Sequence, residues 1–357
     1  DAAPLAADAC PRLATWSDDL HGASLVHEPK RFASWTWVAS EPPQGMCLPP
    51  GGSDLAEWRH GLSGQIRSLG IVTTRSVTRH ADTRFAGGFA TCGRVAVTTD
   101  VFIGEGETED TFATIDLAFA DLPDGRTVVG MQRATLLHRA FVRECKGLYL
   151  LLPNDCFNGY TRRMAGAAGA RLLQGRPLRG GLFRTNGHWL AVDDRLGVLG
   201  LYGGDEIVVN QPHAAQIDIH ASMHHSHAGD PGGLLYADEV CFGACADDAG
   251  FREAGTLFDV GFAVRASATA AETEAWSRTR SARLVAPDAL RAVRVAGADG
   301  RDYLVAAHFG EETASLRLAD DGTSPWEAVD GGASFVRRDG ALALTLDPGT
   351  TRVLGRG

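Results

Sequence analysis

The stretch that decides the fold is Tyr-Leu-Val-Ala-Ala-His-Phe-Gly at residues 303–310. A polar turn at 298–301 precedes it, and the runs Ala-Ser-Leu-Arg-Leu (314–318) and Ala-Leu-Ala-Leu-Thr-Leu (341–346) follow. Side chains of a strand alternate between two faces, so a period of two interrupted by Gly and Pro predicts strands rather than helices. Residues 286–357 are therefore predicted to form a small β-domain.

The same alternation continues upstream of this domain. It predicts a strand at 31–38, with Trp35 and Trp37 on one face, and roughly a dozen strands between residues 69 and 286. The clearer ones are 71–79, 88–98, 111–118, 127–134, 140–144, 148–152, 188–192, 198–202, 205–209, 234–240 and 257–265. Asp124-Gly125 is a hairpin signal.

Helical character is confined to three segments, 54–69, 158–168 and 270–279. Thr269 and Glu272 form a capping-box pattern at the start of the last one. Strands do not alternate with long helices, which argues against a doubly wound or TIM-barrel fold. We predict an all-β chain with an N-terminal surface segment (1–30), a large antiparallel β-sandwich or supersandwich (31–285) and a small C-terminal β-sandwich (286–357).

Composition narrows the class of protein. A formal net charge of -10 argues against a nucleic-acid or anionic-membrane partner. No apolar run reaches the about 18 residues that predict a membrane-spanning helix. The sequence has no GxSxG, P-loop, Rossmann or HExxH motif, and we expect no cofactor. Only Lys30 and Lys146 are lysines.

The chain begins at Asp1 without Met, which is expected of a processed or excised product. No CxxC motif occurs among its cysteines, which stand at positions 10, 47, 92, 145, 156, 241 and 245. Their scatter fits buried thiols of a cytosolic protein at least as well as a disulfide framework. Cysteine usage therefore favours the cytosol.

Asp54, Glu57 and Trp58 form a first candidate site. On a helix, Asp54 and Trp58 would share a face. A tryptophan plate beside a carboxylate can stack a sugar and then protonate it, which would make Glu57 a catalytic acid. An acidic helix start with a core tryptophan explains the same residues.

A second candidate follows the predicted strand at 148–152. It combines amides, a carboxylate, a phenol and a guanidinium in Asn154, Asp155, Asn158, Tyr160 and Arg162. Such a set can bind a sugar or neutralise a uronate before Tyr160 or Asp155 moves a proton. The alternative is an Asx-rich turn that caps a helix.

Two further candidates lie nearby. His220, His224 and His227 belong to a His-rich segment that could bind zinc, although an exposed His-rich loop explains them too. Asp238 and Glu239 are consecutive in a predicted strand, so one of them must face inward and needs partners. We take Glu239 as a catalytic candidate.

The order of these elements resembles a known architecture. The strands, the segment Trp-Leu-Ala-Val-Asp-Asp-Arg-Leu-Gly (189–197) and the β-tail are similar to the C-terminal β-regions of polysaccharide lyases and some glycoside hydrolases. In those enzymes an α/α-toroid precedes a β-supersandwich, and His-Glu-Pro-Lys-Arg-Phe (27–32) is similar to the point of handover. The resemblance covers residues 27–357, and no family catalytic motif matches.

The resemblance implies a carbohydrate-active protein, all or part of a glycoside hydrolase or polysaccharide lyase. Its partners would be an oligo- or polysaccharide and a helical catalytic domain or second chain. Because this chain has no toroid, no catalytic residue is transferred from the family. Trp35, Trp37, Trp58 and Trp189 are the predicted sugar-stacking plates. The alternatives are a non-catalytic carbohydrate-binding module and a metal-binding β-protein centred on the histidines.

Overall fold

The computed structural model describes most of the chain. The described residues are 15–39, 43–56, 62–68, 73–103, 106–154, 159, 161–174, 181–211, 237–246, 249–279, 282–283, 289–319, 324–331, 335–338 and 340–357. Nearly all the elements in these ranges are β-strands, and every strand pair is antiparallel. No described helix has the length and apolar character needed to cross a membrane.

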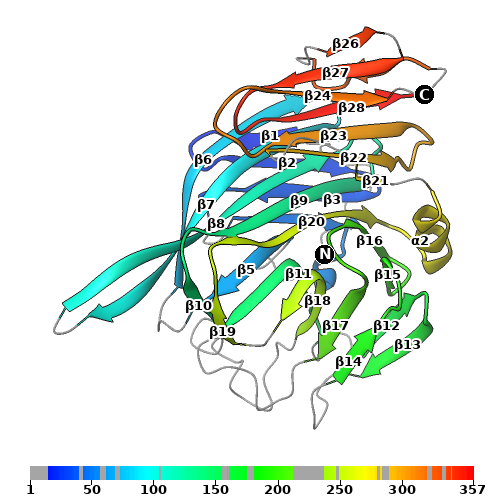
Figure 1. Cartoon of the computed structure of the whole chain (residues 1–357). Helices are drawn as coiled ribbons and strands as arrows, with labels where there is room; N and C mark the ends of the chain where they lie inside the picture. The colour runs from blue at the N-terminus through cyan, green and yellow to red at the C-terminus, as the bar shows by residue number, and fades with distance from the viewer. Residues whose placement is uncertain are drawn as a thin grey trace, which may run out of the picture.

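The centre of the molecule is a nine-stranded sheet (Figure 1). Its strands β7 and β8 continue beyond their neighbours as a two-stranded arm (Figure 1). In spatial order the strands are β13 (Gly169–Gln174), β12 (Thr161–Gly166), β15 (Trp189–Val192), β16 (Leu196–Tyr202), β20 (Gly255–Ala266), β9 (Thr127–Leu136), β8 (Gly106–Asp121), β7 (Gly88–Ile103) and β6 (Thr73–Phe85).

The predicted Asp124-Gly125 hairpin joins β8 to β9. Asp124 Oδ1 accepts hydrogen bonds from the backbone N–H groups of Arg126 (2.9 Å) and Thr127 (2.7 Å). Gly125 has a φ of 72°, which a glycine adopts without steric cost. The local sequence therefore fixes this turn as predicted.

One face of the central sheet is covered by two smaller sheets. The first contains β1 (Thr15–Asp18), β2 (Ala23–Glu28), β3 (Arg31–Thr36) and β4 (Gln44–Leu48). The second has the order β14 (Gly181–Arg184), β17 (Ile207–Gln211), β18 (Ala237–Ala246), β11 (Glu144–Pro153) and β5 (Ser63–Arg67). A short pair, β10 (Ala140–Val142) with β19 (Gly250–Arg252), lies beside them. Strands β1 and β2 thus share a sheet with β3 and β4, although both lie within residues 1–30.

The core between these sheets is rich in aromatic side chains. Trp35 and Trp37 contact each other edge-to-face with ring centroids 5.3 Å apart. Trp37 Nε1 donates to Thr91 Oγ1 at 2.6 Å, and Trp35 packs on Phe119. Alternate residues of β3 point into this core, which is the pattern that the sequence predicted.

The C-terminal β-domain covers the opposite face of the central sheet (Figure 1). Its inner sheet contains β21 (Ala282–Arg283), β22 (Leu290–Ala296), β23 (Asp302–His308), β28 (Thr351–Arg356) and β25 (Glu327–Ala328). Its outer sheet contains β24 (Ala314–Ala319), β27 (Ala341–Leu346) and β26 (Phe335–Arg338). The described strands thus confirm the predicted all-β sandwich class.

Two arginines tie the C-terminal domain to the central sheet. Arg79 and Arg94 donate to the Phe309 carbonyl at 3.0 and 2.8 Å. Both also pair with the Glu311 carboxylate, and the Arg79 contact measures 2.6 Å. The small domain is therefore held by ionic contacts as well as by an apolar interface.

One of the three predicted helices is present. The helix α2 (Ala270–Ser277) begins with the predicted capping box, in which Thr269 Oγ1 accepts from the backbone N–H of Glu272 at 3.2 Å. The predicted helix at 54–69 was wrong, because its described residues form a 3-10 turn (Ser53–Leu55) and strand β5. The predicted helix at 158–168 was also wrong, because β12 pairs through a tight turn with β13.

Packing explains the error at β5. A Cβ added to Gly64 would lie 2.6 Å from Phe258, so the strand fits closely against the central sheet only with glycine there. Ser63 and Gln65 are polar but buried, which hid the strand pattern from the sequence.

Candidate functional site

Strand β18 places two consecutive acids on opposite faces of the five-stranded sheet, as its alternation predicted. Asp238 points inward and is fully buried, whereas the Glu239 side chain points outward and is 15% exposed. The two carboxylates have separate sets of hydrogen-bond partners. Each face therefore carries its own polar group.

The outward polar group gathers around Glu239, and we call it the Glu239 group. It consists of Glu144, Lys146, Tyr149, Asn210 and Glu239. Glu239 Oε1 accepts from the Tyr149 hydroxyl at 3.0 Å. Its Oε2 contacts Lys146 Nζ at 3.1 Å and accepts from Asn210 Nδ2 at 3.0 Å.

Strand register and a bulge bring these side chains together. Asn210 is the direct cross-strand partner of Glu239. The register of β11 shifts between Lys146 and Leu148, so Lys146 and Tyr149 lie on the same face although they are three residues apart. Gly147 occupies this bulge, and a Cβ there would lie 2.4 Å from the Phe242 carbonyl oxygen.

The charges and burial of the Glu239 group determine the protonation states of Lys146 and Tyr149. Burial opposes the charge on Lys146, but Glu239 and Glu144 outweigh it and raise the lysine pKa above its ordinary value. Burial, and then the Glu239 charge, raise the pKa of Tyr149 well above its ordinary value. At neutral pH Lys146 is therefore a cation, and Tyr149 keeps its hydroxyl proton.

Apolar side chains lie beside the Glu239 group on the same face. Leu151 is the cross-strand partner of Glu239, and Leu182 is the partner of Asn210. Directly paired residues of antiparallel strands point to the same side of a sheet. Leu182 is 51% exposed, and the order β14-β17-β18-β11 places Leu182 and Leu151 at opposite ends of the row that contains Asn210 and Glu239.

A second ionic group, the Asp54–Arg162 cluster, consists of Asp54, Arg162, Asp193 and Arg195. The Arg162 side chain is 1% exposed and contacts Asp54 at 3.1 Å and Asp193 at 2.7 Å. Arg195 reaches both Asp54 oxygens, at 2.9 and 3.1 Å. Burial opposes the Asp54 charge, but the two guanidiniums outweigh it and lower the carboxyl pKa.

Asp238 projects from the inward face of β18 toward this cluster, whose Arg162 and Asp193 charges act on it. Its Oδ2 accepts from Asn154 Nδ2 at 3.1 Å, and its Oδ1 accepts from Gln211 Nε2 at 3.1 Å. Burial raises the pKa of Asp238 to about 6. Asn154 is fully buried, and its own Oδ1 has no hydrogen-bond partner.

The structure brings together three predicted site residues, Asp54, Asn154 and Arg162, around the inward side of β18. Trp35 and Trp37 are 2% and 1% exposed, so their rings offer no surface to a sugar. Trp189 is half-buried against the core beneath the C-terminal domain. The other predicted site residues lie outside the described ranges: Glu57, Trp58, Asp155, Asn158, Tyr160, His220, His224 and His227.

Sequence reasoning proposed Glu239 as a candidate but did not propose the residues that contact or neighbour it in the structure, Glu144, Lys146, Tyr149 and Asn210. One signal was available, because Lys146 is one of two lysines in a chain that otherwise uses arginine. A single lysine in a strand indicates a position where a compact ammonium is preferred to a planar guanidinium.

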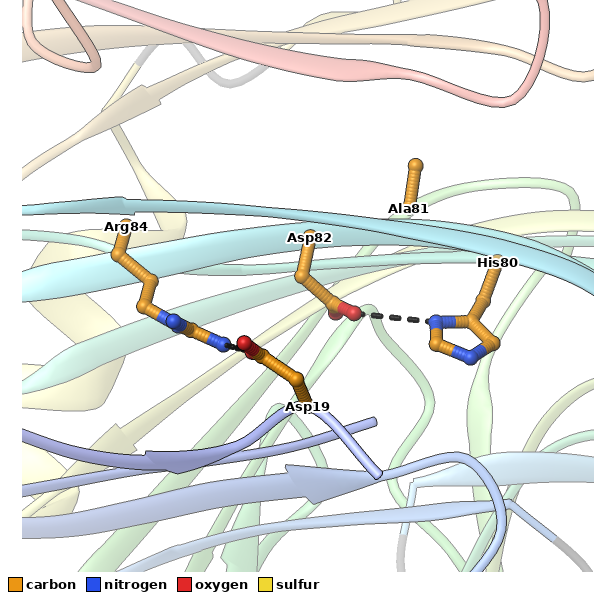
Figure 2. A pocket seen from close by; sticks show the side chains of 5 residues that line it. All are labelled: Asp19, His80, Ala81, Asp82 and Arg84. Carbon is orange, nitrogen blue, oxygen red and sulfur yellow. Dashed lines mark hydrogen bonds and ion pairs between the residues drawn. The ribbon is translucent and has the colours of Figure 1, made fainter. Parts of the chain in front are cut away.

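A groove lies between β6 and the turn after β1 (Figure 2). It has a volume of about 370 Å³ and is lined by Asp19, His80, Ala81, Asp82 and Arg84. His80 Nδ1 lies 3.0 Å from Asp82 Oδ2, and Arg84 pairs with Asp19. His80 also stacks on Trp37 at 5.8 Å between centroids. The polar groups of this groove thus already pair with one another.

Within the described residues, no set of three His, Cys, Asp or Glu side chains is placed to hold a metal ion. Four of the described cysteines, Cys47, Cys92, Cys145 and Cys241, are buried free thiols. Burial raises the pKa of the Cys47 and Cys92 thiols to about 12, so neither is a reactive thiolate at neutral pH.

No protein family and no curated protein matches its sequence. Among solved structures it is similar to a Paenibacillus xanthan lyase (7% identity, TM-score 0.47, covering 94% of this chain and 36% of that one). A Streptomyces coelicolor chondroitin AC lyase is 16% identical with a TM-score of 0.38, and the match covers 94% of this chain and 48% of that one. A Lactobacillus brevis α-galactosidase is 9% identical with a TM-score of 0.41, and the match covers 73% of this chain and 42% of that one.

All three structures are carbohydrate-active enzymes by name. The chain spans less than half the length of each of them. A TM-score below 0.5 assigns neither an activity nor a substrate to this chain.

Proposed function

We propose that this chain is all or part of a carbohydrate-active enzyme, a glycoside hydrolase or polysaccharide lyase, whose site is the Glu239 group. One observation carries the proposal. A partly exposed carboxylate is oriented by three donors, Tyr149, Lys146 and Asn210, at 3.0 to 3.1 Å. Carboxylates oriented in this way serve as acid, base or nucleophile in glycosidic bond cleavage.

The group also has the chemical character that a saccharide requires. Glu144, Glu239 and Asn210 can bond to sugar hydroxyls, because carboxylate and amide oxygens accept from them. Leu182, which is 51% exposed beside Asn210, offers an apolar surface for the C–H face of a sugar ring. A polar cluster with an exposed apolar neighbour is typical of small-molecule sites.

Charge balance favours hydrolysis of a neutral sugar over elimination from a uronate. Elimination needs a cation that neutralises the substrate carboxylate and a base that removes the C5 proton. Lys146 is already paired with Glu144 and Glu239, and Arg67 is paired with Glu144 at 3.4 Å. Tyr149 keeps its proton, so it is placed to donate a hydrogen bond rather than to act as a phenolate base.

The roles follow from these contacts. Glu239 is the base or nucleophile, and the Tyr149 hydroxyl, which donates its single proton to Glu239 Oε1, orients this carboxylate. Glu144 is the second carboxylate of the pair, and Lys146 holds both carboxylates in place. A pair of carboxylates is what both retaining and inverting hydrolases require.

Turnover of a panel of neutral and uronic polysaccharides tests the proposal. We expect new reducing ends from a neutral substrate, without the ultraviolet absorbance of an unsaturated uronate. Glu239→Gln should lower kcat at least about 100-fold, the scale of a lost acid–base group. Glu206→Gln is the matched control, because Glu206 precedes β17 of the same sheet and pairs with Arg184 at the surface.

Three results would change the assignment. An unsaturated product would replace hydrolysis with elimination. Saccharide binding without turnover would make the chain a non-catalytic binding module. Turnover that Glu239→Gln leaves intact would place the chemistry elsewhere on the chain or on a partner.

A further inference from the structure

Asp238 joins the strands that carry the Glu239 group. Asn154 directly follows β11, which carries Lys146 and Tyr149, and its amide donates to Asp238 Oδ2. Gln211 ends β17, which carries Asn210, and its amide donates to Asp238 Oδ1. One inward carboxylate thus holds three adjacent strands directly behind Glu239.

The surroundings of Asp238 make this contact sensitive to protons. The side chain is fully buried, and burial is the largest influence on its ionisation. Gln211 and Asn154 favour the carboxylate through their hydrogen bonds, Arg162 of β12 favours it by its charge, and Asp193 of the β15–β16 turn opposes it. Burial outweighs these partners, so the ionised Asp238 carboxylate is less stable in the folded protein than in water.

Asn154 allows Asp238 to exist in both protonation states. In the structure both Asp238 oxygens accept hydrogen bonds, which is the pattern of an ionised carboxylate. A protonated carboxyl must donate, and the buried Asn154 Oδ1 is without a partner. Rotation of the Asn154 amide by half a turn would bring this oxygen to the carboxyl proton. Asp238 therefore keeps two hydrogen bonds in both protonation states.

We propose that Asp238 is a positioning residue that holds Glu239 in place through Asn154 and Gln211, and that release of its proton loosens the pairing of β17 with β18. Opening these strands lets the carboxylate reach water, where its pKa is the ordinary 3.8 rather than about 6. A group whose pKa is raised by folding stabilises the closed strands below pH 4, and this contribution is lost as the pH rises to about 6.

Amide hydrogen exchange of β17 and β18 tests the proton-dependent part without any substrate. After correction for the intrinsic pH dependence of exchange, wild-type protection should fall by up to about 100-fold between pH 4 and pH 7, the factor that two pKa units correspond to. Asp238→Asn should remove this fall, while the strands β22 and β23 of the C-terminal domain serve as an internal reference. Protection that is independent of pH in the wild type, or an equal fall in Asp238→Asn, would overturn the proposal.

The positioning role rests on the proposed function and has a separate readout. For the folded fraction of each variant, Asp238→Leu should lower kcat about tenfold or more with KM unchanged, because Glu239 shifts while the sugar-binding face remains. Asp238→Asn, which keeps an amide–amide contact, should restore most of kcat. An equal kcat in wild type and Asp238→Leu would overturn the positioning role. Absence of any turnover would refute the proposed function and leave the exchange experiment valid.

Discussion

The two sides of strand β18 hold similar ionic side chains in different environments. On the outward side, Glu239, Glu144 and Lys146 form a partly exposed group with a tyrosine and an amide. On the inward side, Arg162 is enclosed among Asp54, Asp193 and the Pro153 carbonyl. Arg162 is 1% exposed, whereas its partners Asp54 and Asp193 are 37% and 21% exposed and Glu239 is 15% exposed. The comparison teaches that the inward side differs by one enclosed guanidinium and not by the exposure of its carboxylates.

The largest effect on stability should come from the enclosed side. Arg162→Met removes a guanidinium that is 1% exposed and leaves Asp193 without this cation, while Asp54 keeps its pairing with Arg195. Breaking a fully buried pair costs about 3–5 kcal/mol. Asp54 and Asp193 are partly exposed, so water screens their charges and the expected loss is about 2–3 kcal/mol. Urea unfolding measures this loss, and Arg184→Met, which removes an exposed ion pair on β14, is the control. A loss below about 1 kcal/mol would show that the cluster is not structural.

Asp238 should have the next largest effect on the free energy of unfolding, and this effect depends on pH. A pKa of about 6 in place of 3.8 means that the folded state binds the proton more tightly, so stability declines as the pH rises from 4 to about 6. Relative to Asp238→Asn, the wild type should lose about 2 kcal/mol of unfolding free energy between pH 4 and pH 7. Denaturant titrations at both pH values measure the difference. A difference that stays constant with pH would contradict the assignment.

On the outward side, stability should change less than activity. Tyr149→Phe removes one hydrogen bond to Glu239, which is worth about 1 kcal/mol in stability. The same change should lower kcat at least about tenfold if the hydroxyl assists the reaction. Tyr303→Phe is the control, because the Tyr303 hydroxyl donates to Asp299 at 2.7 Å in the C-terminal domain. Equal kcat values for the two variants would remove Tyr149 from the site.

The smallest effect should come from Arg195, which shares Asp54 with Arg162. Its side chain is 39% exposed, so water screens its contacts with the carboxylate. Arg195→Gln should cost no more than about 0.5 kcal/mol in the same urea experiment. A cost close to that of Arg162→Met would show that exposure does not separate the two arginines.

Local sequence patterns predicted much of the strand content. The alternation around Trp35, the turn at Asp124-Gly125 and the cap at Thr269 depend on neighbouring residues only, and all three are confirmed. The strands at 63–67 and 161–166 were missed because their polar residues become buried only through distant packing partners. Long-range packing overrides local propensity at such positions.

The candidate site also has one part that local sequence predicts and one part that depends on distant strands. Alternation alone placed Asp238 and Glu239 on opposite faces, because strand geometry is local. The partners Lys146 and Tyr149 come from a strand that lies about 90 residues earlier in the chain, and a bulge sets their common face. Neither pairing register nor a bulge can be read from the sequence of β18.

The crystal structure of Glu239→Gln with an oligosaccharide that the wild type cleaves tests the central claim most directly. The account predicts a sugar over β11, β17 and β18, with a ring or glycosidic oxygen about 3 Å from the Tyr149 hydroxyl and from the residue 239 side chain. A sugar bound instead in the groove beside His80 and Asp82, with the Glu239 face empty, would contradict it.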